Sequence, residues 1–366
     1  MAHRPADPAR PAPASASADG AVAPSARPAF FADESVRRRP VAVFDSGVGG
    51  LTVLHELLVQ LPHEDFVYLA DSARFPFGTR SQAELEAFSL EIAEALLARG
   101  AKLLVVACNS ATAAALPALR ARMMETTIGV DVLGVVQPGA VQAVAATRTG
   151  RVGLLATPAT VASGAYARAL AAVDPFVELT PVACPDLTTI IEGGFPFDQR
   201  VVDTVREYCA PLREARVDTV ILGCTHYPLV RPMLQRMLGR GVEIISSGTP
   251  LARQVEHVLG ARGLGNPREG EGDYRFLCTG DVGAFRALGT RFLQLPLGEV
   301  TAVDLDGAAA GPRPAAHEPG GPRPATHEPG GSRPATHDAA GRGDAARERA
   351  ASVWAASGRA AAGGGR

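Results

Sequence analysis

The sequence LLVVACNSATAAAL, residues 103–116, carries the clearest information about how this chain folds. Five apolar residues precede Cys108, and two small polar residues and an alanine-rich segment follow it. A continuous apolar run is typical of a strand buried on both faces of a parallel sheet, whereas alanine favours a helix. We therefore predict that Cys108 lies where a buried strand gives way to a helix.

Three other short apolar runs also end in small polar residues. They are VAVF before Asp45, VGLLA before Thr157 and TVILG before Cys224. Because helical patterns lie between the runs, the sequence predicts an α/β fold with open parallel sheets. In such sheets ligands bind beyond the carboxyl ends of the strands, which is where these polar residues fall.

The clearest helical pattern is SQAELEAFSLEIAEALLARG, residues 81–100. Ser81 and Glu84 have the spacing of a capping box at its start, and Gly100 is the expected end. Four apolar residues recur on one face: Leu85, Phe88, Ile92 and Leu96. The segment is therefore predicted to be an amphipathic helix.

The arrangement of strands occurs twice along the chain. The strand ending at Asp45 is followed by the one ending at Cys108, and the strand ending at Thr157 is followed, after a similar interval, by the one ending at Cys224. Two similar α/β units would each place a cysteine at the carboxyl edge of a sheet. If those edges face one another they present two thiols; chance similarity between βα units is the alternative.

The two ends of the chain differ in composition from the middle. The first residues are rich in Pro, Ala and Ser, and residues 311–340 form a ten-residue repeat that contains His317, His327 and His337. Such segments bury too little apolar surface to become ordered, and proline-rich spacing favours a solvated tail over metal capture. We predict a disordered arm over 1–38, a first α/β domain over 39–135 and 243–305, a second α/β domain over 136–242, and a disordered tail over 306–366.

The composition excludes several classes of protein. With 36 Lys and Arg against 38 Asp and Glu, the formal net charge is −2. This argues against a nucleic-acid partner, because such a surface needs clustered positive charge. No apolar stretch of about 18 residues occurs, so we expect no membrane partner. Five cysteines, an odd number without a secretory signal, suggest reduced thiols in a cytoplasm.

Lys102 is the only lysine in the chain. It begins the strand that ends at Cys108, and a strand rising about 3.3 Å per residue places it roughly 20 Å from that tip. A pyridoxal phosphate Schiff base at the predicted site is therefore not expected. No other cofactor is predicted.

Two of the five cysteines differ from the rest. Cys184, Cys209 and Cys278 fit the ordinary interpretation of cysteine as a small buried hydrophobe. Cys108 and Cys224 each follow a strand at a predicted helix start, where unpaired backbone N–H groups favour a thiolate. These two thiols are therefore the candidates for acid/base or nucleophilic chemistry.

A carboxylate and an imidazole accompany the thiols. Asp45 begins a glycine-rich turn within FDSGVGGLTVL, residues 44–54. The turn is no dinucleotide fingerprint, because Thr52 replaces the third glycine, and no phosphate loop, because no lysine follows. Its N–H groups could hold a substrate carboxylate, although a turn that needs glycine only for steric reasons is the simpler alternative. His226, two residues after Cys224, could relay protons near neutral pH.

Three chemistries can be built from these groups. Cys108, Cys224 and His226 could bind a catalytic zinc ion, although no close cysteine pair gives the usual ligand spacing. One cysteine with His226 could form an acyl-transfer dyad, which leaves the second thiol without a role. In the third chemistry one thiol removes a proton from a stereogenic carbon, and the other returns a proton to the opposite face.

Four segments together resemble the glutamate racemase family, within the cofactor-independent aspartate/glutamate racemase superfamily. They are FDSGVGGLTVL, ADSARFPFGTRS, VVACNSATA and ILGCTHYPL, in the expected order, and the similarity extends from Val41 to Gly248. The resemblance implies two α/β domains with the active site in the cleft between them. It also implies a cytoplasmic isomerase that interconverts L- and D-glutamate without cofactor or metal, for peptidoglycan synthesis, cell-wall biogenesis and cell shape. Glutamate is the implied small-molecule partner, and a homodimer is left open.

The resemblance assigns roles to individual residues. It implies that Cys108 and Cys224 are the two acid/base residues, assisted by Asp45 and His226. It implies substrate contacts at eight positions within the four segments: Asp45, Ser46, Phe77, Gly78, Asn109, Ser110, Thr225 and His226. Further substrate-binding candidates are Thr157, Thr160 and Glu192.

Three positions depart from the family pattern. Phe77 stands where the family usually has Tyr, Ser110 where it usually has Thr, and Ser246 where an acidic residue is common. The sequence does not predict how these three departures change the affinity for substrate. The alternatives to a glutamate racemase are a racemase for aspartate or another amino acid, a zinc-dependent Cys/Cys/His enzyme, and a non-catalytic amino-acid-binding protein.

Overall fold

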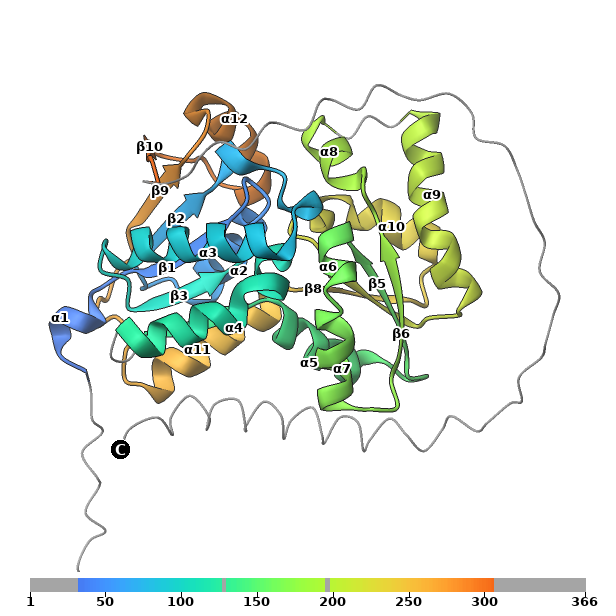
Figure 1. Ribbon diagram of the computed structural model, residues 1–366, viewed down its shortest axis with the longest axis horizontal. Helices are drawn as coiled ribbons and strands as arrows, with labels where there is room; N and C mark the ends of the chain where they lie inside the picture. Colours follow the sequence, from blue (N-terminus) through green and yellow to red (C-terminus); the bar gives the residue numbers. More distant parts are fainter. Residues whose placement is uncertain (1–31, 127–129, 195–197, 306–366) are drawn as a thin grey trace, which may run out of the picture.

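The computed structural model describes residues 32–126, 130–194 and 198–305, which form two α/β units side by side (Figure 1). The predicted tail over 306–366, with its repeated histidines, lies outside the described residues, as does most of the predicted arm. Within the described part of the chain, no helix is long and apolar enough to cross a membrane.

The first sheet has six strands, all paired in parallel, in the order β10-β9-β2-β1-β3-β4. They are β1 (Val41–Asp45), β2 (Phe66–Ala70), β3 (Leu103–Val106), β4 (Asp131–Gly134), β9 (Tyr274–Cys278) and β10 (Val300–Ala302). β1 and β3 are buried throughout, as their continuous apolar sequences predict. Phe44 pairs with Val106, so Asp45 and Cys108 lie at the same edge of the sheet.

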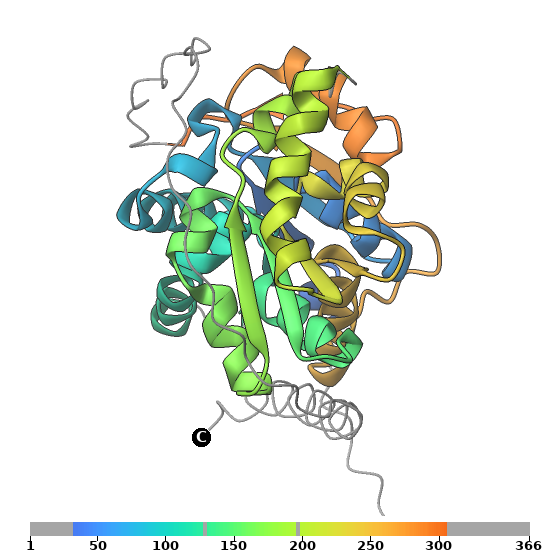
Figure 2. The ribbon, with the colours of Figure 1, turned by 90° about the vertical axis from the view of Figure 1, so that its right-hand side faces the viewer.

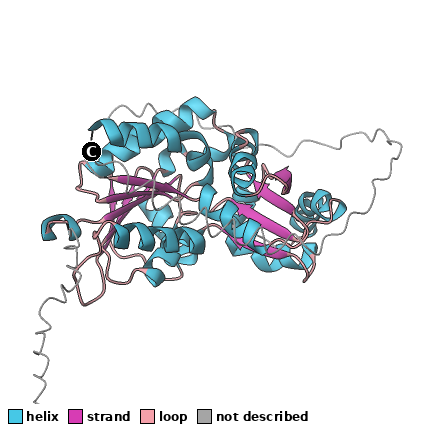
Figure 3. Ribbon diagram, turned by 90° about the horizontal axis from the view of Figure 1, so that it is seen from below, coloured by secondary structure: helices cyan, strands magenta, loops and turns pink. Residues whose placement is uncertain are grey.

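Helices cover both faces of the first sheet (Figures 1 and 3). One face packs against α2 (Leu51–Gln60), α11 (Gly248–Ala261) and α12 (Val282–Leu293), and the other against α3 (Gln82–Leu97) and α4 (Asn109–Thr126). Two short 3₁₀ helices, η1 (Ser72–Arg74) and η2 (Phe77–Thr79), follow β2. α3 has the predicted capping box between Ser81 and Glu84, and Gly100 beyond its end has a φ of 81°.

The second sheet has four parallel strands in the order β6-β5-β7-β8. They are β5 (Arg151–Ala156), β6 (Glu178–Ala183), β7 (Thr219–Gly223) and β8 (Glu243–Ser246). One face packs against α5 (Val136–Ala146) and α7 (Ala165–Val173), and α6 (Pro158–Ala162) follows β5. The other face packs against α8 (Leu187–Glu192), α9 (Gln199–Glu214), η3 (Tyr227–Val230) and α10 (Arg231–Leu238) (Figure 2). The predicted pair of parallel-sheet α/β units is therefore confirmed.

One hydrophobic core continues from the first sheet to the second. It joins Val43 of β1 and Leu54 of α2 with Leu222 of β7 and Leu234 of α10 in a single cluster of buried side chains. Each sheet also has a separate core on its other face. The two units are therefore connected by apolar packing as well as by the chain.

The strand β8 differs from the predicted division of the chain. Residues 243–305 were assigned to the first α/β domain, but β8 pairs with β7, with Ser246 opposite Leu222. The chain returns to the first unit in α11, which packs against α2. A short apolar strand gives no local sign of which sheet it joins, because pairing is a long-range contact. The other domain boundaries remain predictions.

The prediction that residues 1–38 form a disordered arm is wrong for its last part. Glu34–Arg37 form the short helix α1, which Asp33 caps by accepting a hydrogen bond from the Ser35 N–H. Arg37 donates from Nε to the Gly265 carbonyl at 2.9 Å, and Lys102 Nζ donates to the Arg37 carbonyl. The composition of the arm gave no sign of this, because its partners are distant in the sequence.

Candidate active site

Cys108 lies between β3 and α4, at the strand-to-helix junction that the sequence predicts. The residue is 5% exposed, and the Ala111 N–H donates toward its Sγ at 3.5 Å. Burial nevertheless raises the pKa of the Cys108 thiol, and the charge of Asp45 raises it further. The N–H groups of Ser110 and Ala111 at the helix start lower the pKa of Cys108, as expected, but desolvation of the buried anion outweighs them.

Cys224 follows β7 on the second sheet and is also buried. The predicted helix start after it is a turn followed by the 3₁₀ helix η3, and the α-helix α10 begins only at Arg231. Its Sγ lies 3.8 Å from Nδ1 of His226 and 3.6 Å from Oγ1 of Thr188. An imidazole and a hydroxyl are therefore the polar neighbours of this thiol.

His226 is hydrogen-bonded through both ring nitrogens. Nδ1 faces Cys224, and Nε2 lies 2.8 Å from Oε1 of Glu192. Burial lowers the pKa of a histidine, but the bonds to Cys224 and Glu192 outweigh it and raise the pKa of His226 to about 10. Both bonds therefore favour the imidazolium form of the ring. Glu192, a candidate substrate contact in the sequence, is placed as the partner of this imidazolium.

Asp45 ends β1 and is fully buried. Its carboxyl group accepts hydrogen bonds from the Gly47 N–H at 3.2 Å and from the Thr225 hydroxyl at 3.4 Å. Burial raises the pKa of Asp45, and the positive charge of His226 opposes this shift. The carboxyl group thus connects the edge of the first sheet with the CTH turn of the second.

Gly49 allows the two units to approach closely at this point. A Cβ at residue 49 would lie 2.3 Å from Oγ1 of Thr225 and 2.4 Å from the ring of His226. Thr52 adds a direct link, since its hydroxyl donates to the Thr225 carbonyl at 2.9 Å. Gly49 has no positive φ, so this glycine is needed for contact between the units and not for a special backbone conformation.

Three buried hydroxyl groups form a triangle between the two units. Ser110 Oγ, at the start of α4, lies 2.9 Å from Thr157 Oγ1 and 3.1 Å from Thr160 Oγ1. The two threonine hydroxyls are 3.0 Å apart, and Thr157 caps the N-terminus of α6. Gly78 lies against this triangle, because a Cβ there would be 2.8 Å from Thr157. The triangle offers hydroxyl donors of the kind that bind a carboxylate.

The remaining predicted residues lie in the same region. Ser46 is buried beside Asp45, and Phe77 is buried with its ring 5.7 Å from that of Phe88. The Asn109 amide donates from Nδ2 to the Tyr166 hydroxyl at 2.7 Å. The structure therefore brings the predicted thiols, carboxylate, imidazole and hydroxyls to the carboxyl ends of both sheets.

Three residues at this site were not predicted from the sequence. Thr188 contacts Cys224, Tyr166 contacts Asn109, and the ring of Phe75 lies 6.0 Å from that of His226. Thr188 and Tyr166 lie within helices, and no local pattern marks a polar contact between distant segments. Phe75 lies inside the quoted segment ADSARFPFGTRS, so the sequence could have indicated it.

The geometry also bears on two alternative chemistries. Among the residues that the structure describes, no three or more His, Cys, Asp or Glu side chains are placed to hold a metal ion. Cys108, Cys224 and His226 therefore do not form a zinc ligand set here. The second alternative is a pyridoxal phosphate Schiff base, which would need Lys102. This residue lies at the opposite end of β3 from Cys108, where its buried ammonium group pairs with Glu64 at 2.6 Å.

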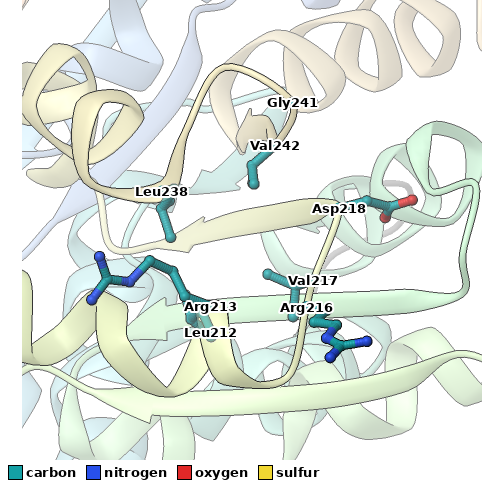
Figure 4. A pocket seen from close by; sticks show the side chains of 8 residues that line it. All are labelled: Leu212, Arg213, Arg216, Val217, Asp218, Leu238, Gly241 and Val242. Carbon is teal, nitrogen blue, oxygen red and sulfur yellow. The ribbon is translucent and has the colours of Figure 1, made fainter.

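A hollow of about 300 Å³ lies elsewhere in the second unit (Figure 4). It is lined by the ends of α9 and α10 and by residues 217–218 and 241–242, which precede β7 and β8. The guanidinium groups of Arg213 and Arg216 point away from it in Figure 4. Since it lies at the amino ends of the strands, it is separate from the candidate active site.

A thiol on each of two parallel sheets, beside an imidazolium and a carboxyl group, defines an α/β protein equipped for proton transfer. The family model for Asp/Glu/Hydantoin racemase matches residues 51–255. This chain belongs to that racemase family. The similar relatives are glutamate racemases, and that of Acidothermus cellulolyticus is 45% identical over 267 residues, which cover 73% of this chain and 99% of the relative.

Two solved structures extend the similarity to three dimensions. The crystal structure of glutamate racemase isoform RacE1 from Bacillus anthracis has 37% sequence identity and a TM-score of 0.69, over 74% of this chain and 98% of that chain. Glutamate racemase from Francisella tularensis, in complex with D-glutamate, has 32% sequence identity and a TM-score of 0.68, over 74% of this chain and 99% of that chain. The resemblance inferred from the four sequence segments is confirmed.

Proposed function

We propose that this protein is a glutamate racemase, an isomerase that interconverts L- and D-glutamate, and that Cys108 and Cys224 transfer the α-proton. The observation that supports this most strongly is the pair of buried thiols at the carboxyl edges of two different sheets. Cys224 contributes to the raised pKa of Cys108, so the two sulfur atoms are within electrostatic range. Two acid/base groups on opposite sides can invert a stereogenic carbon while the substrate stays in place, because one removes the proton and the other returns one.

Each turnover moves one proton off the α-carbon and another onto it. A thiolate takes the α-proton and becomes a thiol, while the electron pair stays on the substrate as a carbanion delocalised into the carboxylate. The opposite thiol donates its proton to the other face and becomes a thiolate. The imidazolium of His226 can stabilise a thiolate at Cys224. Cys108, with its raised pKa, can keep its proton until the proton is donated to the carbanion.

The polar groups around the thiols match the charges of glutamate. The hydroxyl triangle of Ser110, Thr157 and Thr160 offers donors to a carboxylate, as do the N–H groups of the turn after Asp45. Asp45 and the amide oxygen of Asn109 offer acceptors to the ammonium group. Glutamate is our choice of substrate because the similar proteins are glutamate racemases and one of them holds D-glutamate.

Substitution of each thiol tests the proposal. Cys108→Ser and Cys224→Ser should each lower the rate of glutamate racemisation by roughly 10³-fold, since each removes one acid/base group. Polarimetry of either enantiomer measures this rate. Cys209→Ala is the matched control, because Cys209 is fully buried in α9 and has no proposed role, and it should stay within about threefold of wild type. Full activity in either serine variant would contradict the two-thiol assignment.

Aspartate is the nearest alternative substrate. It has the same ammonium and carboxylate groups but is one methylene shorter. Exchange of the α-proton in deuterated water, followed by NMR for glutamate and aspartate separately, distinguishes the two. Our proposal expects exchange for glutamate at least about tenfold faster, and faster exchange for aspartate would overturn the substrate assignment.

The production of D-glutamate also suggests the compartment and the cellular process in which the protein acts. We assign it to the cytoplasm, where the five free cysteines of the described chain would stay reduced, and to the supply of D-glutamate for peptidoglycan. Depletion of the protein in its source cells should cause loss of cell shape that external D-glutamate relieves. Unchanged growth and shape on depletion would contradict this role.

A further inference from the structure

The hydroxyl of Tyr166 lies where three distant segments of the chain meet. Tyr166, in α7, is 1% exposed, and its Oη lies 2.7 Å from Nδ2 of Asn109 and 3.3 Å from Oγ of Ser247. Asn109 directly follows Cys108, and Ser247 connects β8 of the second sheet with α11 of the first unit. The phenol of Tyr166 therefore links the candidate site to the segment in which the chain passes from the second unit to the first.

The donors and acceptors of these groups determine how the Asn109 amide is oriented. Nδ2 can only donate, so the Tyr166 oxygen accepts from it, and the phenol also shares a hydrogen bond with Ser247 Oγ, in which either the phenol proton or the serine proton is donated. Burial raises the pKa of Tyr166 to about 12, so the phenol keeps its proton near neutral pH. Because Nδ2 is bound to Tyr166, the amide oxygen faces away from the phenol.

The amide oxygen of Asn109 needs a donor. It is buried, and it has no hydrogen-bond partner among the residues that the structure describes. A buried carbonyl oxygen is destabilising unless a donor meets it. An amino-acid substrate offers an ammonium group, which only donates, and carboxylates, which only accept. The oxygen therefore suits the ammonium group, whereas a flipped amide would present donors to a carboxylate.

We propose that Tyr166 is a positioning residue, whose hydroxyl holds the Asn109 amide with its oxygen toward the ammonium group of the substrate. This rests on the proposed function, since it takes glutamate as the ligand. Ser247 supports the arrangement through its hydrogen bond to the Tyr166 hydroxyl. Without the hydroxyl, Nδ2 loses its buried partner and the amide can rotate, so recognition of the ammonium group weakens while recognition of carboxylates is kept.

The test compares two ligands that differ in the ammonium group. Calorimetric titration measures Kd for racemic glutamate, whose composition turnover does not change, and for glutarate, which lacks the amine. Tyr166→Phe should weaken glutamate binding about tenfold and glutarate binding by less than about twofold. Equal weakening of both ligands, or unchanged glutamate binding, would overturn the proposal, because a general disturbance of the fold would not select the amine.

Two further variants keep the test decisive. Tyr208→Phe removes a hydroxyl that donates to Asp186 at 3.0 Å outside the site, and it should leave both Kd values within about twofold. If Tyr166→Phe does not fold, Ser247→Ala takes its place and should weaken glutamate alone, by about threefold. A wild type that binds glutamate but leaves L-glutamate optically unchanged contradicts the proposed function, and the Kd comparison still decides the role of Tyr166.

Discussion

At the scale of single residues, the ionisation of His226 connects the site to the stability of the fold. Its pKa in the folded protein is about 10, against about 6.5 for an ordinary histidine in an unfolded chain. The folded state therefore holds this proton more tightly. The resulting stabilisation is fully present below about pH 6.5 and is lost as the pH rises toward 10.

Urea denaturation from pH 6 to 10 tests this linkage. The free energy of unfolding of wild type should fall more steeply with pH than that of His226→Gln, which cannot titrate. Glu192→Gln removes the charge of one of the two partners of the ring and should give an intermediate slope. Parallel profiles for wild type and His226→Gln would show that the imidazole is not held as a cation.

Ser110 makes a second prediction for a single residue. Ser110→Ala removes the hydroxyl that joins Thr157 and Thr160, so KM for glutamate should rise about tenfold with a smaller change in kcat. Ser89→Ala is the control, because the Ser89 hydroxyl is equally buried but donates to the Leu85 carbonyl within α3. An equal rise in KM for both variants would argue against a substrate-binding role for the triangle.

The thiols and their charged neighbours could be predicted because each follows a short apolar run. Asp45 ends a buried strand, Cys108 and Cys224 lie just beyond the ends of two others, and the carboxyl edges of parallel sheets are where ligands bind. The pKa of Cys108 could not be predicted, because it depends on burial by the rest of the fold. Tyr166 could not be predicted either, because its contacts to Asn109 and Ser247 are distant in the sequence.

At the scale of elements, the turn after β1 sets how closely the two units approach. Gly49→Ala places a Cβ against Thr225 and His226, both buried at the site. We expect a loss of stability of about 1–3 kcal/mol and a large loss of racemisation, because the two sheets must move apart. Thermal denaturation and polarimetry measure the two effects.

Gly260→Ala is the matched control for that variant. Gly260 lies in α11, and a Cβ there meets nothing within 4 Å. Alanine favours a helix over glycine, so this variant should be more stable by up to about 1 kcal/mol and fully active. Retained activity in Gly49→Ala would show that the contact between the turn and the CTH segment is not required.

The strands at the centre of each sheet were the most predictable elements. β1, β3, β5 and β7 are short continuous apolar runs, and burial on both faces leaves a clear pattern in the sequence. β8 and α1 were assigned wrongly, because their positions depend on long-range contacts. β8 joins the second sheet through β7, and α1 is held through the Arg37 carbonyl by Lys102.

At the scale of the whole molecule, Lys102 holds separate segments together. Its buried ammonium group pairs with Glu64 and donates to the carbonyls of Arg37 and Leu264. Lys102→Met should lower the free energy of unfolding by about 3–5 kcal/mol, because it leaves the buried Glu64 carboxylate with the Asn266 N–H but without its positively charged partner. Chemical denaturation measures this loss.

The same variant separates structure from chemistry. Folded Lys102→Met should keep kcat within about twofold of wild type, because Lys102 lies at the far end of β3 from Cys108. The double variant Lys102→Met, Glu64→Gln should recover part of the lost stability, since it removes the buried charge. Loss of turnover in a folded Lys102→Met protein would contradict the assignment of the chemistry to the two thiols.

Two sheets, each with one thiol at its carboxyl edge, are the basis of the proposed two-sided proton transfer. The most direct test follows L-glutamate in deuterated water at early conversion, with NMR and chiral separation of the two enantiomers. If one thiol removes the proton and the other returns a solvent-derived deuteron, the first D-glutamate formed carries deuterium at the α-carbon while the remaining L-glutamate does not. Early D-glutamate that keeps its original proton, or L-glutamate that gains deuterium as fast as the product, would contradict two-sided proton transfer.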